Sequence, residues 1–165
     1  TSLALKAAET LEHTRSTREL VYRLSEDVRN SQSITIYAAF DEREDPLYDG
    51  AHNKIGNYLV LQEINVDEEI TRTVGYYLLE AADGDGWILY RHDSETSDLD
   101  PEELPDPFTA GVHVAVTRAV TLPEPNHLFR SLRDRGVAIR GEFGAAGPVK
   151  RGRTEFVQCA LSTRS

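Results

Sequence analysis

The chain has 165 residues, of which 39% are hydrophobic and 28% are charged, a composition typical of one globular domain and too apolar for a disordered chain. Its 18 basic and 28 acidic residues give a net charge of −10, which argues against nucleic-acid binding and against attraction to anionic membrane surfaces. The single cysteine, Cys159, excludes an internal disulfide and a cysteine-based zinc site. We therefore expect one domain over residues 1–165.

The chain contains no methionine, even at position 1, and no run of eighteen apolar residues. The missing start residue predicts that the chain begins inside a longer natural product, after processing or trimming. As it stands, nothing in the sequence is apolar enough over a sufficient length to cross a bilayer.

The first 31 residues are predicted to form one long helix. They contain neither Pro nor Gly and are rich in good helix formers such as Ala, Leu, Glu and Arg. Hydrophobic side chains recur at helical spacing in two groups, which a polar stretch from Glu12 to Glu19 separates. The first group is Ala4, Ala7, Ala8 and Leu11, and the second is Leu20, Val21, Leu24 and Val28. We expect the second group to face the core and the first to reach beyond the domain.

Residues 33–165 are predicted to form a β-rich globular part, because the hydrophobic period changes from 3.6 to 2. The expected strands are Ile34–Phe40, Tyr58–Ile64, Ile70–Glu80, Trp87–Arg91, Val112–Leu122, Val137–Phe143 and Glu155–Leu161. The second to fourth of these follow one another closely and predict an antiparallel meander. Residues 41–53, 93–107 and 123–134 are expected to be loops, the last with a helical turn near Leu128 and Phe129. The predicted fold class is α+β, with a long N-terminal helix packed on a mainly antiparallel β-sheet.

The sequence carries no motif of a known catalytic constellation, neither a nucleophile elbow nor a zinc-protease helix nor a phosphate-binding loop. Gly141, Gly144 and Gly147 resemble a dinucleotide fingerprint only loosely, because they do not lie between a strand and a helix and Pro148 follows them. The five histidines show no local ligand spacing and are expected to be ordinary surface or packed side chains. We therefore predict that the protein is not an enzyme and has no resident cofactor.

An acidic stretch offers the one candidate metal site. Asp93, Glu95, Asp98 and Asp100 place four carboxylates within eight residues, and Ca²⁺ takes six to eight hard oxygen ligands from a flexible loop. The spacing differs from that of an EF-hand. The competing interpretation is a solvated acidic loop, which is what charge runs usually are.

Charge is distributed unevenly along the sequence. Seven acidic residues and no basic one lie from Asp93 to Asp106, whereas seven basic residues lie from Arg130 to Arg153. Complementary patches of this kind steer and orient partner subunits. The alternative interpretation, two unrelated solvated surfaces, stays open at this point.

The passage from the helix into the first strand, Arg18 to Ser31 followed by Ile34-Thr35-Ile36, resembles that of type IV pilin-like proteins, above all the minor pseudopilins of type II secretion. Tyr58–Ile64, Val74–Leu78 and Gly86–Arg91 are similar to the central meander of these proteins. The stretch from Phe156 to Arg164 looks like their closing strand. The similarity covers most of the chain, and none of its motifs is diagnostic by itself.

Two departures from the family pattern bear on this resemblance. The family's Gly cleavage site and the apolar membrane stretch with a Glu near its start are missing from the sequence, as expected of a chain trimmed for solubility. Many type IV pilins close their C-terminal region with a disulfide, which the lone Cys159 cannot form. This second departure favours a pseudopilin-like or other minor subunit over a major pilin.

The resemblance implies a structural subunit of a pilus- or pseudopilus-type filament that serves protein secretion or surface attachment without catalysis. Its partners would be other pilin or pseudopilin subunits, and a missing apolar N-terminal helix would anchor it in the inner membrane, with the domain on the periplasmic or extracellular face. The loops over residues 41–53 and 93–107 would face partner subunits or cargo. The alternative is an extracytoplasmic sensor or ligand-binding domain of a membrane receptor, which requires a formed pocket with convergent polar groups.

Overall fold

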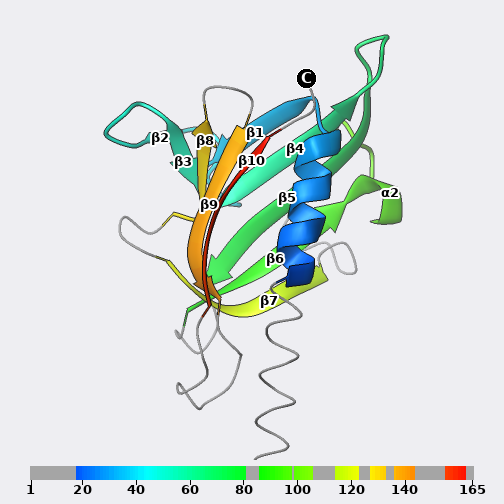
Figure 1. The fold of residues 1–165 in the computed structure, drawn as a ribbon. Helices are drawn as coiled ribbons and strands as arrows, with labels where there is room; N and C mark the ends of the chain where they lie inside the picture. Colours follow the sequence, from blue (N-terminus) through cyan, green and yellow to red (C-terminus); the bar gives the residue numbers. More distant parts are fainter. Residues whose placement is uncertain are drawn as a thin grey trace, which may run out of the picture.

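The structure is a computed structural model that describes residues 18–80, 86–97, 99–105, 114–122, 127–132, 136–143 and 155–162. In these residues ten strands form one antiparallel sheet in the order β1-β4-β5-β6-β7-β9-β8-β3-β2, and β10 pairs with β9 (Figure 1). The strands are β1 Ser33–Tyr37, β2 Leu47–Tyr48, β3 Lys54–Gly56, β4 Tyr58–Ile64, β5 Ile70–Glu80, β6 Trp87–Asp93, β7 Val114–Thr121, β8 Phe129–Leu132, β9 Gly136–Phe143 and β10 Glu155–Ser162.

The N-terminal helix is described over residues 18–30 and leads directly into β1. Its end is set by Ser31, whose amide and hydroxyl both donate to the carbonyl oxygen of Val28 at 3.2 and 2.8 Å. These bonds satisfy a carbonyl that the last turn would otherwise leave without a partner. The helix thus ends at Asn30, one residue before the predicted bound. The first half of the predicted helix lies outside the described residues.

The predicted fold class is wrong. The described chain is mostly antiparallel β-sheet with only a short N-terminal helix, instead of a long helix that defines one layer of an α+β fold. The reason lies in the distribution of buried side chains. Of the fifteen buried residues of the main core, the described part of the helix contributes Leu20, Leu24 and Val28, whereas twelve come from the strands and the segments beside them. The sheet therefore supplies most of the hydrophobic burial that holds the domain together.

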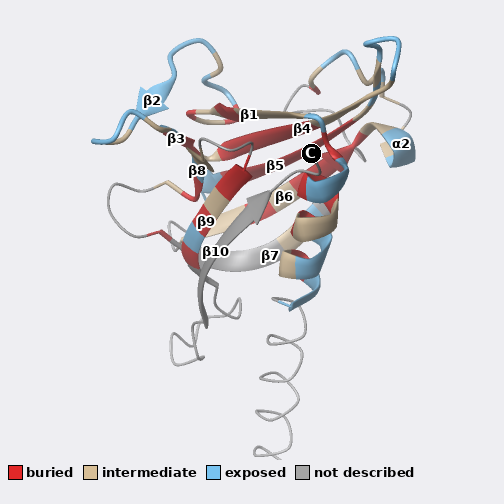
Figure 2. Ribbon diagram, turned by 45° about the horizontal axis from the view of Figure 1, so that its top comes forward, coloured by how far each residue is buried: buried red, intermediate tan, exposed pale blue. Residues whose placement is uncertain are grey.

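The main core lies inside the curl of the sheet, where the helix covers it (Figure 2). Side chains from distant strands meet here, among them Leu59 of β4, Leu89 of β6 and Ile139 of β9. The two ends of the strand order also approach one another, because the amide of Asn57 after β3 donates to the carbonyl oxygen of Ala38 after β1 at 3.0 Å. The curl thus gives one continuous core to strands that are far apart in the sheet.

The opposite face of the central strands holds a second, aromatic core. Phe40, Tyr58, Val60 and Tyr77 are buried there, and Tyr37, Tyr90 and Leu104 pack against them. Phe40 stacks on Tyr77 with ring centroids 4.0 Å apart. Both faces of β4 and β5 are covered. Their sequences therefore contain continuous hydrophobic runs instead of alternating hydrophobic and polar residues.

Several sequence predictions of strands are confirmed. β4 and β5 have the predicted bounds, β9 and β10 differ from theirs by one residue, and β4, β5 and β6 form the predicted meander with antiparallel pairing. Two loop predictions are wrong. The segment 41–53 contains the short strand β2, and the helical turn expected near Leu128 and Phe129 is the start of β8 instead. The acidic stretch after β6 begins with the helical turn α2, Ser94–Ser97.

Gly75 on β5 shows how closely the second core is packed. It lies directly opposite His92 on β6, and a Cβ atom added to Gly75 would stand 2.0 Å from Nε2 of the His92 ring. The ring has little freedom to move away, because His92 is 1% exposed and its Nε2 lies 2.8 Å from the hydroxyl of Tyr58. Only a residue without a side chain fits at this position.

We predict that Gly75→Ala lowers the free energy of unfolding by about 1–3 kcal/mol, the usual effect of forcing one extra carbon into a packed core. Urea denaturation of the wild type and the variant measures this difference. Gly50→Ala is the matched control, because nothing lies within 4 Å of a Cβ at Gly50. Equal stabilities of the two variants would contradict the packing described here.

Candidate functional site

A buried network of charged side chains joins the N-terminal helix to the central strands. Asp27 lies on the sheet-facing side of the helix, and Arg91 of β6 places NH2 at 3.1 Å and Nε at 3.2 Å from its Oδ2 atom. The hydroxyl of Tyr76 on β5 donates to the same oxygen at 2.5 Å. The Asp27 and Arg91 side chains are 7% and 8% exposed, so water contributes little to the solvation of either charge. Each charge therefore depends on the other.

Asp93 continues the network along β6. Its carboxylate accepts two hydrogen bonds from Arg72 of β5, Nε to Oδ1 at 3.0 Å and NH2 to Oδ2 at 2.6 Å, in the bidentate geometry that gives strong pairs. Arg91 NH2 donates to the same Oδ2 atom at 3.2 Å. Arg72 also forms two longer ion pairs. Its Nη1 atom lies 3.5 Å from Oε2 of Glu63 on β4, and its Nε atom lies 3.2 Å from Oε2 of Glu95 on α2. Three carboxylates thus surround Arg72, and one of them, that of Asp93, also binds Arg91.

The network follows from the alternation of side chains along the strands. Alternate residues of β6 point to the same side of the sheet, namely Leu89, Arg91 and Asp93. Leu89 belongs to the main core, and the charged side chains of Arg91 and Asp93 follow it on the same face. Arg72 and Tyr76 lie on the neighbouring strand β5. Charged side chains therefore lie at one end of the sheet face that the helix covers.

The surroundings of these groups shift their pKa values in directions that favour ion pairs. Burial alone would raise the pKa of Asp93, but the hydrogen bonds from Arg72 and from the Glu95 amide outweigh it and hold the pKa below its usual value. The hydrogen bond to Asp93 likewise raises the pKa of Arg72. Burial raises the pKa of Tyr76, and the adjacent Asp27 raises it further, so its hydroxyl stays a donor to that carboxylate.

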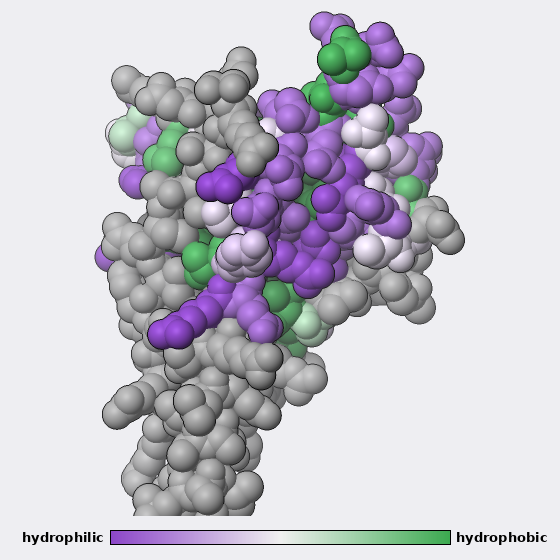
Figure 3. Space-filling model, turned by 45° about the vertical axis from the view of Figure 1, so that its right-hand side comes forward, coloured by the Kyte–Doolittle hydropathy of each residue, from purple (hydrophilic) through white to green (hydrophobic). Residues whose placement is uncertain are grey.

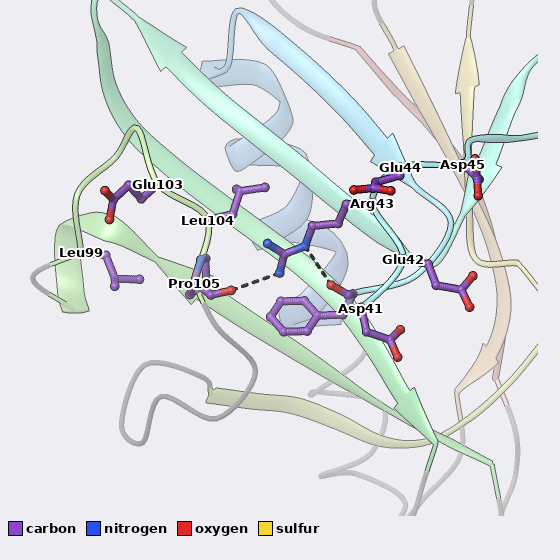
Figure 4. A pocket seen from close by; sticks show the side chains of 10 residues that line it. Asp41, Glu42, Arg43, Glu44, Asp45, Leu99, Glu103, Leu104 and Pro105 are labelled. Atoms are coloured by element: carbon purple, nitrogen blue, oxygen red, sulfur yellow. Dashed lines mark hydrogen bonds between the residues drawn. The ribbon is translucent and has the colours of Figure 1, made fainter.

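An open groove with a volume of about 890 Å³ lies beside the second core. One wall is formed by residues 40–45 and the other by residues 99–105, which we call the wall segment (Figure 4). Arg43 spans the two walls, because its Nε donates to the carbonyl oxygen of Phe40 at 2.8 Å and its NH2 to that of Pro105 at 3.1 Å. Its guanidinium also stands over the Phe40 ring, 4.8 Å from the centroid.

The groove is acidic at its margins. The carboxylates among its lining residues are Asp41, Glu42, Glu44, Asp45 and Glu103. Figure 4 shows Asp41 and Glu42 pointing away from the Arg43 guanidinium. This acidic surface includes part of the stretch that the charge pattern singled out. On the basic side, Arg130 and Arg140 are exposed, and the other five basic residues of the sequence pattern lie outside the described residues.

The four candidate calcium ligands do not form a free carboxylate cluster in the part that is described. Asp93 is buried, and its carboxylate is bound by Arg72 and Arg91. Glu95 is exposed beside Arg72, and Asp100 accepts a hydrogen bond from the Glu102 amide at 3.0 Å. Asp98 lies outside the described residues. Within the described ranges no group of three or more His, Cys, Asp or Glu side chains is arranged to hold a metal ion. Calcium binding by this stretch stays a prediction.

Sequence reasoning missed the Asp27–Arg91 pair, although a signal was present. Asp27 follows Leu20 and Leu24 by seven and three residues, which places a charged side chain on the apolar side of the helix. A carboxylate at such a position is rarely buried without a cation. The partner could not be named, because it lies 64 residues further along the chain. The groove was missed for the same reason, since Arg43 and Pro105 are 62 residues apart.

Comparison with protein-family models, with curated proteins and with solved structures finds no match to this chain.

We predict that the unfolding free energy falls as the pH drops below about 4, partly because Asp93 must be protonated. Its folded pKa is depressed, so its contribution is present above the unfolded value of about 3.9 and is lost as the pH falls through the folded value. Urea denaturation at a series of pH values measures the slope, which Asp93→Asn should make shallower. Asp67→Asn, at an exposed carboxylate on the turn after β4, is the control. Equal slopes in the two variants would exclude this role for Asp93.

Proposed function

We propose that the protein is a structural subunit of a pilus- or pseudopilus-type filament that serves protein secretion or surface attachment, without catalysis. The observation that carries the proposal is the buried junction of Asp27 with Arg91 and Tyr76. In such a filament the helices of neighbouring subunits pack together, and any force on a helix must pass into its own globular part. A subunit of this kind needs a firm attachment between helix and sheet.

The junction supports this role because it combines two kinds of interaction. Leu20, Leu24 and Val28 bury their side chains in the main core, and Asp27 between them forms the ion pair with β6. Hydrophobic contacts alone allow a helix to slide or rotate, whereas a hydrogen-bonded buried pair fixes its position along the sheet. The helix and the sheet therefore respond as one body.

The outward side of the helix is available for neighbouring subunits. Arg18, Tyr22, Arg23 and Arg29 are exposed on it, and Tyr22 is the most exposed large aromatic residue described, at 71%. The described residues on the face of the molecule in Figure 3 are mostly hydrophilic, with separated hydrophobic residues among them. This surface favours polar contacts with neighbours, with Tyr22 as an aromatic contact point.

Anchoring in the inner membrane by an apolar helix and placement on the periplasmic or extracellular face belong to the same proposal. They rest on the resemblance to minor pseudopilins. In the part of the chain described here, no helix is both long enough and apolar enough to span a membrane.

The groove favours a second candidate function. An extracytoplasmic sensor or ligand-binding domain needs a hollow with convergent polar groups, and the groove offers Arg43 between two walls with five carboxylates. A ligand of this groove would have to be cationic. The groove is open, which suits a flexible peptide better than an enclosed metabolite.

We predict that Tyr22 lies at a subunit contact in the cell. In a Cys159→Ser background, Tyr22→Cys in the full-length protein, labelled with a maleimide that carries a benzophenone and then irradiated, should give adducts with a second copy or with another pilin-like subunit, identified by mass spectrometry. Val66→Cys, on the turn after β4, is the control and should label equally well in the purified protein, because Val66 is 98% exposed.

A filament subunit gives adducts at position 22 in intact cells and few at position 66. If both variants label with a monofunctional maleimide but neither yields adducts, the filament proposal is wrong and the ligand-binding function becomes the better account.

A further inference from the structure

Asp93 connects the ion network beneath the N-terminal helix to the helical turn α2. On the helix side its carboxylate accepts a hydrogen bond from Arg91, which also binds Asp27 of the helix. The same residue begins α2: its Oδ1 atom accepts from the Glu95 amide at 3.0 Å, and its carbonyl oxygen accepts from the Ser97 hydroxyl at 2.5 Å. The Glu95 bond is an N-cap interaction, which stabilises the first turn of a helix.

α2 and the wall segment are in turn attached to β5 through one residue. The Thr73 amide donates to the Ser94 hydroxyl oxygen at 3.0 Å, and the Thr73 hydroxyl donates to the carbonyl oxygen of Pro101. The far end of the wall segment is attached to the opposite wall by the bond from Arg43 to Pro105. Thr73 therefore links α2 to the wall segment, because it bonds to Ser94 in the one and to Pro101 in the other.

We propose that docking of the N-terminal helix is coupled to the order of the groove wall through the Asp93 carboxylate. Asp27 and Asp93 share one donor, Arg91 NH2, at 3.1 and 3.2 Å. When Asp27 is withdrawn, the guanidinium turns fully to Asp93 and competes with the Glu95 amide for its oxygens. The cap of α2 weakens, and the wall segment opens more often.

This coupling goes beyond the proposed function and holds for either candidate. In a filament, contacts on the helix would alter the groove that meets the next partner. In a receptor, occupation of the groove would alter the seating of the helix, because coupling between two sites is reciprocal. The docked and undocked states of the helix differ in how Arg91 is bound. It binds both Asp27 and Asp93 when the helix is docked, and Asp93 alone when it is not.

Hydrogen exchange followed by mass spectrometry tests the coupling on the whole chain. Asp27→Asn should accelerate exchange over residues 94–97 and in the wall segment by about threefold to tenfold, the effect of weakening one hydrogen bond to a charged group. Glu26→Gln is the matched control, an acid-to-amide change on the same helix at a partly exposed pair with Arg29, and should leave exchange at the wall unchanged.

Amides paired between β1 and β4 serve as the internal reference for global unfolding. Faster exchange in 94–97 and the wall segment, beyond any change in β1 and β4, supports the coupling. If Asp27→Asn accelerates all of these regions equally, its effect is global, and if the wall segment does not respond, no coupling exists. Either result overturns the proposal.

Discussion

Arg91 is a permanent cation held almost entirely away from water, and this constraint organises the structure around it. A guanidinium does not lose its proton at any ordinary pH, so burial must be compensated by carboxylates placed within hydrogen-bond distance. Asp27 and Asp93 provide that compensation from two different elements. The helix can therefore occupy only the position in which Asp27 lies above β6. The fold must first pair the buried charge of Arg91 with carboxylates. Hydrophobic packing then supplies most of the stability.

The two faces of the central strands then take different roles. The face towards the helix carries the main core and ends in the ion network, while the opposite face carries the aromatic core and the groove. Gly75 and His92 show that the aromatic side is packed as tightly as a core, even though it lies beneath loops. A sheet buried on both faces is a stiff platform. It suits a protein whose loops must present a surface while its helix carries contacts on the other side.

The sequence predicted β4, β5 and β9 well, because their hydrophobic runs are long and bounded by turn residues. It failed for β2 and β8, which are two and four residues long and too short to show a period. The prediction of the fold class failed because the helical pattern suggested a large contribution from residues 1–31, whereas burial among the described residues is concentrated in the strands. The ion network and the groove depend on contacts between residues more than sixty positions apart, and no local pattern specifies such pairs.

A double-mutant cycle between Asp27 and Arg91 tests the central claim most directly. Asp27→Leu and Arg91→Met remove the charges one at a time and then together, and urea denaturation gives the unfolding free energy of each protein. Arg91→Met leaves the buried Asp27 carboxylate with only the Tyr76 hydroxyl as its partner and should cost about 3–5 kcal/mol, whereas Asp27→Leu leaves Arg91 paired with Asp93 and should cost less. The double variant should recover at least about 2 kcal/mol of the summed loss, because Asp93 keeps Arg72 as its partner. Single effects that add to within about 0.5 kcal/mol would show that the pair does not hold the helix to the sheet.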